Sequence, residues 1–281
     1  MAVGGWRAGL VVLAGAVLAA GTVGCQTSGR KYVTRQRLET GLVVSLDGVG
    51  GYNWGPRWLR GGLDEAGLGQ AIVIYDWSKG WTGLWVGDLV DEQRNRAAAR
   101  DLAHMIASYE ATMPDRPVTI IGHSGGAAIV VWALESMPDN VKVERAILLA
   151  PALAPDYDLS EALRAVRSRL YVTYSPADVA PMAAGTAVFG TMDRQHSVSA
   201  GWLGFKLPPA PADPGQYAKV RQVGWTPDLM KLGNWGGHMG WTTTRFAREY
   251  LAPIITGQSD PGEPLAGAQA AGQKRPAGAR G

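Results

Sequence analysis

The feature that most constrains the fold is a glycine-rich segment, Gly122-His123-Ser124-Gly125-Gly126, that stands between two apolar runs. Residues 118–121 are all β-branched, which is typical of a buried strand, and residues 127–134 are apolar throughout, which is typical of a helix packed on a sheet. The chain must turn sharply at Ser124, and the flanking glycines avoid Cβ clashes. The segment therefore predicts a strand–turn–helix unit with Ser124 at its tip.

A serine on such a turn suits nucleophilic catalysis. Its hydroxyl is a poor nucleophile until a base removes the proton, and the turn lifts the side chain off the sheet, where a histidine can reach it. The same turn aims the backbone N–H of Gly125 at the space where an oxyanion would form. The alternative is a glycine-rich turn with an idle serine.

Length and composition exclude several classes of function. The 281 residues are enough for one large domain with a sizeable core. The net charge of +3 is too small to indicate a nucleic-acid partner. One cysteine and four scattered histidines show no zinc-ligand spacing, so we expect no metal and no organic cofactor. Nothing in the sequence fixes the oligomeric state.

The first 25 residues are expected to be a targeting segment. Arg7 gives a short positive region, and the apolar residues 8–20 are too few to span a bilayer. Residues 21–25 resemble the lipobox of bacterial lipoproteins, although Thr22 replaces the usual aliphatic residue. We expect an extracytoplasmic protein that a lipid on Cys25 anchors to a membrane. The alternatives are a secreted or periplasmic protein after ordinary cleavage, or an uncleaved anchor.

The rest of the chain divides into a tether, a domain and a tail. Residues 26–40 are polar with four basic side chains and are expected to be a tether. Residues 41–257 are expected to form the domain. Residues 258–281 are rich in Gly, Ala and Pro without periodicity, and are expected to be a disordered tail. Within the domain, further strands are expected at 42–46, 71–75, 144–150 and 170–175, and helices at 56–65, 88–113, 159–167 and around 247–254.

The Gly-x-Ser-x-Gly motif in its strand–turn–helix setting resembles that of the α/β-hydrolase family, and the resemblance extends over residues 41–257. It implies the α/β-hydrolase fold, a mostly parallel, doubly wound sheet with helices on both faces. The short connection between residues 150 and 170 leaves no room for a large cap domain. The resemblance also implies a serine hydrolase acting on a small-molecule or lipid ester.

The family's chain order of serine, acid and histidine assigns the partners of Ser124. Asp178 follows the strand at 170–175, where the family has its acid, and Asp156 and Asp158 are alternatives. His238 has glycines on both sides and precedes the last helix, and His196 is its alternative. The neighbouring His123 is expected to project elsewhere.

Two loops are expected to complete the site. By family position, the loop after strand 42–46 supplies a second oxyanion donor, the N–H of Val49 or, next best, of Gly48. Asp47 would oppose the developing negative charge, so we expect its side chain to turn away and bond loop N–H groups. The loop after strand 71–75 could form an aromatic substrate wall or a satellite core. Its tryptophans are Trp77, Trp81 and Trp85.

These assignments predict acyl transfer to water. His238 takes the proton of Ser124, Asp178 orients His238, and an acyl-enzyme forms and is hydrolysed. A carboxylesterase or lipase is the simplest interpretation. Peptidases, thioesterases and acyltransferases use the same residue types, and a catalytically silent envelope-binding protein is the alternative from a different class.

Overall fold

A computed structural model describes residues 27–78, 87–88, 91–178, 191–195, 197–207 and 214–265. The expectations for Cys25, Trp81, Trp85 and His196 lie outside these residues. Within the described ranges, no helix combines the length and the apolar character that crossing a membrane requires.

One seven-stranded sheet organises the molecule, in the order β2-β1-β3-β4-β5-β6-β7. The strands are β1 Leu42–Leu46, β2 Ala71–Ile74, β3 Val118–His123, β4 Val143–Leu149, β5 Val166–Tyr174, β6 Val220–Gly224 and β7 Glu263–Pro264. The first six are parallel, and β7 pairs with β6 in the antiparallel sense. The strand order reverses direction between β1 and β3, so the loops after these two strands border the crevice where doubly wound sheets bind ligands.

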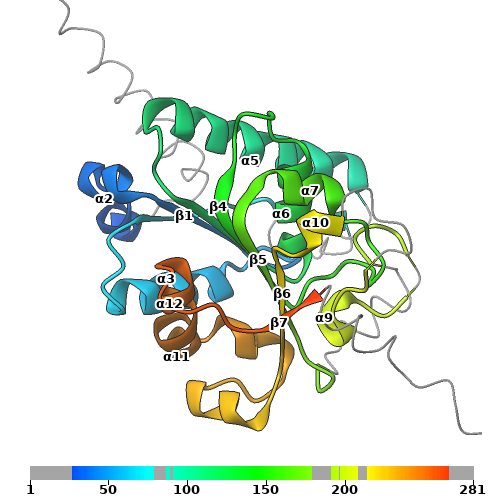
Figure 1. The fold of residues 1–281 in the computed structure, drawn as a ribbon. Helices are drawn as coiled ribbons and strands as arrows, with labels where there is room; N and C mark the ends of the chain where they lie inside the picture. The colour runs from blue at the N-terminus through cyan, green and yellow to red at the C-terminus, as the bar shows by residue number, and fades with distance from the viewer. Residues whose placement is uncertain are drawn as a thin grey trace, which may run out of the picture.

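Helices cover both faces of the sheet (Figure 1). One face carries α5 Glu92–Thr112, α6 Gly125–Glu135 and α7 Ser160–Arg164; the other carries α3 Trp54–Glu65, η3 His238–Thr242, α11 Thr244–Phe246, η4 Ala247–Leu251 and α12 Ala252–Ile255. Smaller elements are η1 Thr27–Tyr32, α2 Arg35–Thr40, α9 Ala200–Leu203, α10 Pro214–Tyr217 and η2 Pro227–Leu232. The expected α/β-hydrolase architecture is confirmed.

The two apolar cores follow from the alternation of side chains along buried parallel strands. On β1, Val43 packs with the α3 layer and Val44 with the α5–α6 layer. Helix α6 is apolar all round because it lies between the sheet and α5. The connection from β4 to β5, described throughout, holds only the short helix α7, so no cap domain is inserted there.

The expected tether over residues 26–40 is wrong for residues 27–40, which fold onto the domain. Leu38 is buried, and its carbonyl accepts the hydroxyl of Tyr109 on α5 at 2.7 Å. Arg37 donates to Asp64 on α3 and to the carbonyls of Leu68 and Gln70. Leu38 is the one fully buried apolar side chain among the side chains that the structure describes in this segment, and much of the attachment is polar, which hydrophobic patterning does not reveal.

The disordered tail was expected to begin at residue 258, but residues 258–265 still belong to the folded domain. Asp260 accepts the hydroxyl of Tyr171 at 2.7 Å and the Nε–H of Arg169 at 3.1 Å. The chain then adds β7 to the edge of the sheet beside β6. Strand β6 itself was not predicted, because polar side chains interrupt its apolar pattern.

Candidate active site

Ser124 stands on the turn between β3 and α6 in a strained backbone conformation. Its φ of 53° and ψ of −119° are rare for a residue with a side chain, and such strain is concentrated at functional sites. A Cβ on Gly122 would lie 2.5 Å from the carbonyl oxygen of Gly126, so the turn requires glycine there. The N–H of Ser124 donates to the carbonyl of Leu149 at the end of β4. Neighbouring strand ends thus hold the serine at the carboxyl edge of the sheet.

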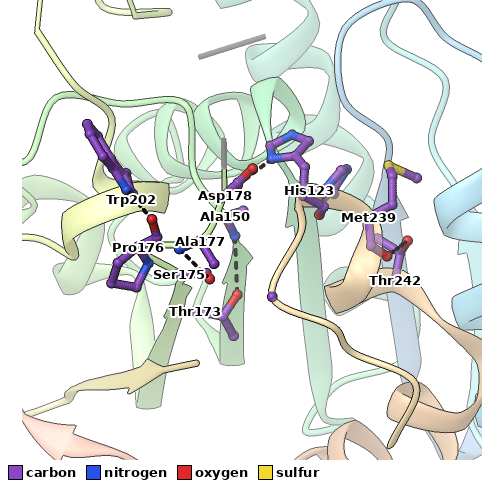
Figure 2. Close-up of polar contacts among 12 residues, drawn as sticks. His123, Ala150, Thr173, Ser175, Pro176, Ala177, Asp178, Trp202, Met239 and Thr242 are labelled. Atoms are coloured by element: carbon purple, nitrogen blue, oxygen red, sulfur yellow. Dashed lines mark hydrogen bonds and ion pairs between the residues drawn. The ribbon is translucent and has the colours of Figure 1, made fainter. Parts of the chain in front are cut away.

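The loop after β5 presents Asp178 to His238. The carboxylate Oδ2 of Asp178 lies 2.7 Å from Nδ1 of His238. Figure 2 shows how the loop is held: Trp202 donates to the carbonyl of Pro176 at 2.7 Å, and the N–H of Ala177 donates to the hydroxyl of Ser175. These two hydrogen bonds fix the backbone of the loop that carries Asp178.

The hydrogen bond to Asp178 determines which nitrogen of His238 is free. A carboxylate only accepts, so Nδ1 carries the proton and neutral His238 has its lone pair on Nε2. This Nε2 is buried, and no residue in the described part of the chain forms a hydrogen bond with it. Burial lowers the pKa of His238 below its ordinary 6.5, and nearby His123 lowers it further, against the raising effect of Asp178. The imidazole is therefore kept neutral and able to accept a proton near pH 7.

His123 lies against His238, contrary to the expectation that it projects elsewhere. The two ring centroids are 4.6 Å apart. Nε2 of His123 lies 3.0 Å from the carbonyl oxygen of His238, to which it must donate. The residue before Ser124 thus ties the turn to the loop that carries His238. In the sequence, His123 stands out only because it is next to Ser124. That position does not predict a contact with His238, which lies far along the chain.

The loop after β1 packs directly against the turn that carries Ser124. A Cβ on Gly48 would lie 3.1 Å from Cβ and 3.5 Å from Oγ of Ser124, and Cγ1 of Val49 would lie 2.9 Å from a Cβ on Gly125. Gly125 opens α6, where the first N–H groups of a helix lack intrahelical partners. This arrangement offers backbone donors beside Ser124.

Gly48 and Val49 differ in their suitability as donors. The N–H of Gly48 already donates to Oδ1 of Asp47 at 2.9 Å, so Gly48 is not available to an oxyanion in this conformation. Val49 and Gly125 remain the candidates. Asp47 uses its carboxylate on a loop N–H, in agreement with the expectation from the sequence.

A polar network holds this loop from the α5 side. Trp77 donates its indole N–H to the carbonyl of Asp47 at 2.8 Å, and buried Asp88 accepts the N–H of Gly50 at 3.1 Å. Arg94 bonds both supports, Oδ1 of Asp88 at 3.2 Å and the carbonyl of Trp77 at 2.6 Å. Trp77 is only 3% exposed and packs in the core. Trp77 therefore stabilises the loop from the core side, and its buried ring does not form an exposed surface for a substrate.

The alternative acids have other surroundings. Asp158 accepts the hydroxyls of Ser160 and Tyr217, each at 2.6 Å, at the start of α7. Asp156 is exposed. Among the residues that the structure describes, no group of three or more His, Cys, Asp or Glu side chains could hold a metal ion.

Comparisons with known proteins agree with this architecture. A family model described as serine aminopeptidase, S33, matches residues 62–197, a range that includes Ser124 and Asp178 and ends before His238. The comparison with curated proteins gave no match.

A solved lipase structure shows the same fold at low sequence identity. Lipase B from Aspergillus fumigatus is 14% identical with a TM-score of 0.53; the match covers 86% of this chain and 57% of the lipase, so the chain spans little more than half of that protein. A lipase-esterase related protein from Clostridium acetobutylicum is 11% identical with a TM-score of 0.44, over 78% of this chain and 94% of the other. Sheet order, the strained serine turn, the family model and the match to the fungal lipase together show that the chain has the α/β-hydrolase fold.

Proposed function

We propose that the protein is a serine hydrolase that cleaves a carboxylic ester or a related acyl bond. The observation that carries this proposal is the state of His238, whose Nδ1 is bonded to Asp178 while its buried Nε2 has no hydrogen-bond partner among the residues that the structure describes. The ring lies against that of His123, the residue before Ser124. General-base activation of a hydroxyl needs a neutral, oriented imidazole that can reach it, and His238 packs against the residue that precedes the strained serine.

In the proposed reaction, Nε2 of His238 takes the proton of Ser124 as its Oγ bonds to the carbonyl carbon. Asp178 holds the tautomer and stabilises the imidazolium, and the N–H groups of Gly125 and Val49 stabilise the oxyanion. His238 then gives the proton to the leaving group. Water, deprotonated by the same imidazole, releases the acyl group and restores Ser124.

A second candidate is hydrolysis of a peptide bond, which the description of the matching family favours. Both reactions proceed through the same acyl-enzyme, so one experiment tests what they share. The full chain is treated with a fluorophosphonate probe and mapped by peptide mass spectrometry beside Ser124→Ala, with Ser197→Ala as the control for a partly exposed serine. Labelling of Ser124 that only Ser124→Ala abolishes supports the proposal. A folded chain that the probe does not label would contradict the serine hydrolase proposal.

Substrate panels then separate the two candidates. Esters of graded acyl length and aminoacyl amides are compared by kcat/KM on the same protein. Preference for esters supports a carboxylesterase or lipase, and preference for amides with a free amino group supports an aminopeptidase.

The amino-terminal pattern supports a further proposal, that the protein is extracytoplasmic and carries a lipid on Cys25. Metabolic labelling with a fatty-acid analogue checks it. Incorporation into the chain but not into Cys25→Ser is the expected result, and equal incorporation into both proteins contradicts it.

A further inference from the structure

One surface beside the site exposes large aromatic side chains. Tyr52, Trp54 and Trp58 are 39%, 55% and 44% exposed, and the rings of Tyr52 and Trp54 lie 5.1 Å apart. Single exposed apolar side chains are common on proteins, but neighbouring tryptophans in such exposure are characteristic of an interaction surface.

Helix α3 combines these aromatics with a cation on one stripe. Trp54, Arg57, Trp58 and Gly61 follow one another at helical spacing, and none of them is buried. The opposite side of α3 packs into the core of the domain. The inward side of α3 is apolar, and its outward side carries aromatic and basic side chains where a surface helix usually carries polar ones.

The segment η1 adds more positive charge to this surface. The Arg60 guanidinium lies 4.3 Å from the ring centroid of Tyr32, and the Lys31 ammonium lies 4.6 Å from the same ring. Lys31 pairs with Asp64, whereas no ion pair within the described residues involves Arg30, Arg57 or Arg60. The surface is positive overall.

We propose that this α3–η1 surface docks on an anionic lipid bilayer. Tryptophan and tyrosine rings prefer the headgroup region, and arginine and lysine are attracted to anionic lipid. The described chain begins at Thr27 in η1, and Gly29 lies opposite the guanidinium of Arg60. Cys25 stands two residues before Thr27 in the sequence, so a lipid there would be attached close in sequence to this surface. Stable membrane attachment generally takes two signals, and the surface supplies the second.

Docking in this way would bring the proposed active site to the bilayer. A Cβ on Gly55 in the first turn of α3 would lie 3.3 Å from Oδ1 of Asp47 and 3.1 Å from Cγ2 of Thr242, which connects α3 with the loops around Ser124. If the protein is the proposed hydrolase, docking predicts that it prefers lipid esters as substrates, and this part of the inference rests on the proposed function. The docking itself does not.

The test measures which face of the full chain meets the membrane. In a Cys25→Ser background, which removes the only thiol, an environment-sensitive fluorophore is attached to Gly61→Cys. A Cβ at this position meets nothing within 4 Å, so the label fits and both tryptophans are retained. The matched control is His104→Cys on α5, an exposed position on the opposite face of the sheet. Both proteins carry the same amino-terminal segment, so any insertion of that segment affects them equally.

On vesicles of phosphatidylcholine with phosphatidylglycerol, the label at position 61 is expected to shift to the blue and to be quenched by brominated lipid, while the label at 104 stays in water. Adding Arg57→Glu is expected to weaken docking roughly 25-fold, about fivefold for each of two units of charge. Trp54→Ser with Trp58→Ser is expected to abolish the shift. Labels at 61 and 104 that respond alike, or a shift that needs no phosphatidylglycerol, would overturn the proposal. Neither readout requires hydrolysis, so a failure of docking is distinguishable from a failure of the proposed enzyme activity.

Discussion

Two imidazole–carboxylate pairs lie side by side at the carboxyl edge of the sheet, and they differ in how the carboxylate is used. Nδ1 of His238 is 2.7 Å from Oδ2 of Asp178. Nδ1 of His123 is 3.8 Å from Oδ1 of Asp47 and forms no hydrogen bond within the described ranges. The same oxygen of Asp47 accepts the N–H of Gly48 instead.

The difference separates two roles of the same residue types. A carboxylate bonded to an imidazole fixes its tautomer and stabilises its cation. A carboxylate bonded to a backbone N–H shapes a loop. We therefore assign Asp178 to the proposed base and Asp47 to the loop beside Ser124, and the following predictions test that division.

The largest effect is expected from Asp178→Asn. An amide can donate to Nδ1 and favour the wrong tautomer, so kcat is expected to fall about 10³–10⁴-fold, by analogy with the same exchange in a serine protease. Ester hydrolysis under saturating substrate measures the loss. Asp156→Asn, an exposed alternative acid, serves as the control and should leave kcat unchanged. A loss of less than tenfold in Asp178→Asn would contradict the assignment.

The next largest effect is expected from Asp88→Asn, which weakens the support behind the loop that follows Asp47. Asp88 is fully buried and its partner Arg94 is partly exposed, so breaking the pair is expected to cost about 2–3 kcal/mol of the free energy of unfolding. Chemical denaturation measures the change. The exposed pair of Lys231 and Asp228 provides the comparison, because Asp228→Asn should cost less than about 1 kcal/mol. Equal losses would show that the network does not support the loop.

A smaller effect is expected from Asp47→Ala, which removes the acceptor of the Gly48 N–H. The loop beside Ser124 should loosen, and kcat is expected to fall about tenfold, as partial loss of an oxyanion donor would cause. Asp47→Asn keeps an oxygen acceptor and should retain most of the activity. If Asp47→Ala instead matched the loss in Asp178→Asn, the division of roles between the two carboxylates would be wrong.

The smallest effect is expected from His123→Gln, and it is mainly one on pH dependence. His238 must be neutral to act as a base, and burial first, then His123, lower its pKa below 6.5. The activity of the wild-type chain should therefore persist below pH 6.5 and fall as the pH drops through the lowered pKa. Removing His123 removes one lowering influence, so the acidic limb of kcat/KM should move to higher pH.

Glutamine retains an N–H that can reach the carbonyl of His238, so this variant separates charge from positioning. His123→Ala removes both, and should lower kcat a few-fold as well as move the limb. His104→Gln on α5 is the control. An acidic limb that moves to lower pH in His123→Gln would show that the two rings are not coupled as described.

The sequence predicted most of the sheet and both long helical layers. Residues 118–134 indicated β3, the turn and α6, because a β-branched run and an apolar run signal a buried strand and a buried helix. Strand β6 and helix α2 were missed, because their stability comes from sheet pairing and from hydrogen bonds such as that between Tyr109 and Leu38.

Local pattern was sufficient for Ser124, because the backbone strain that presents it is encoded by the glycines next to it. Chain order was sufficient to select Asp178 and His238 as candidates. The distance of 2.7 Å between Oδ2 of Asp178 and Nδ1 of His238 depends on how the loop after β5 packs against the start of η3. The contact of His123 with His238, the bonded N–H of Gly48 and the burial of Trp77 were decided by packing alone. Each of these depends on groups that lie far apart in sequence, and only folding of the chain brings such groups within reach of one another.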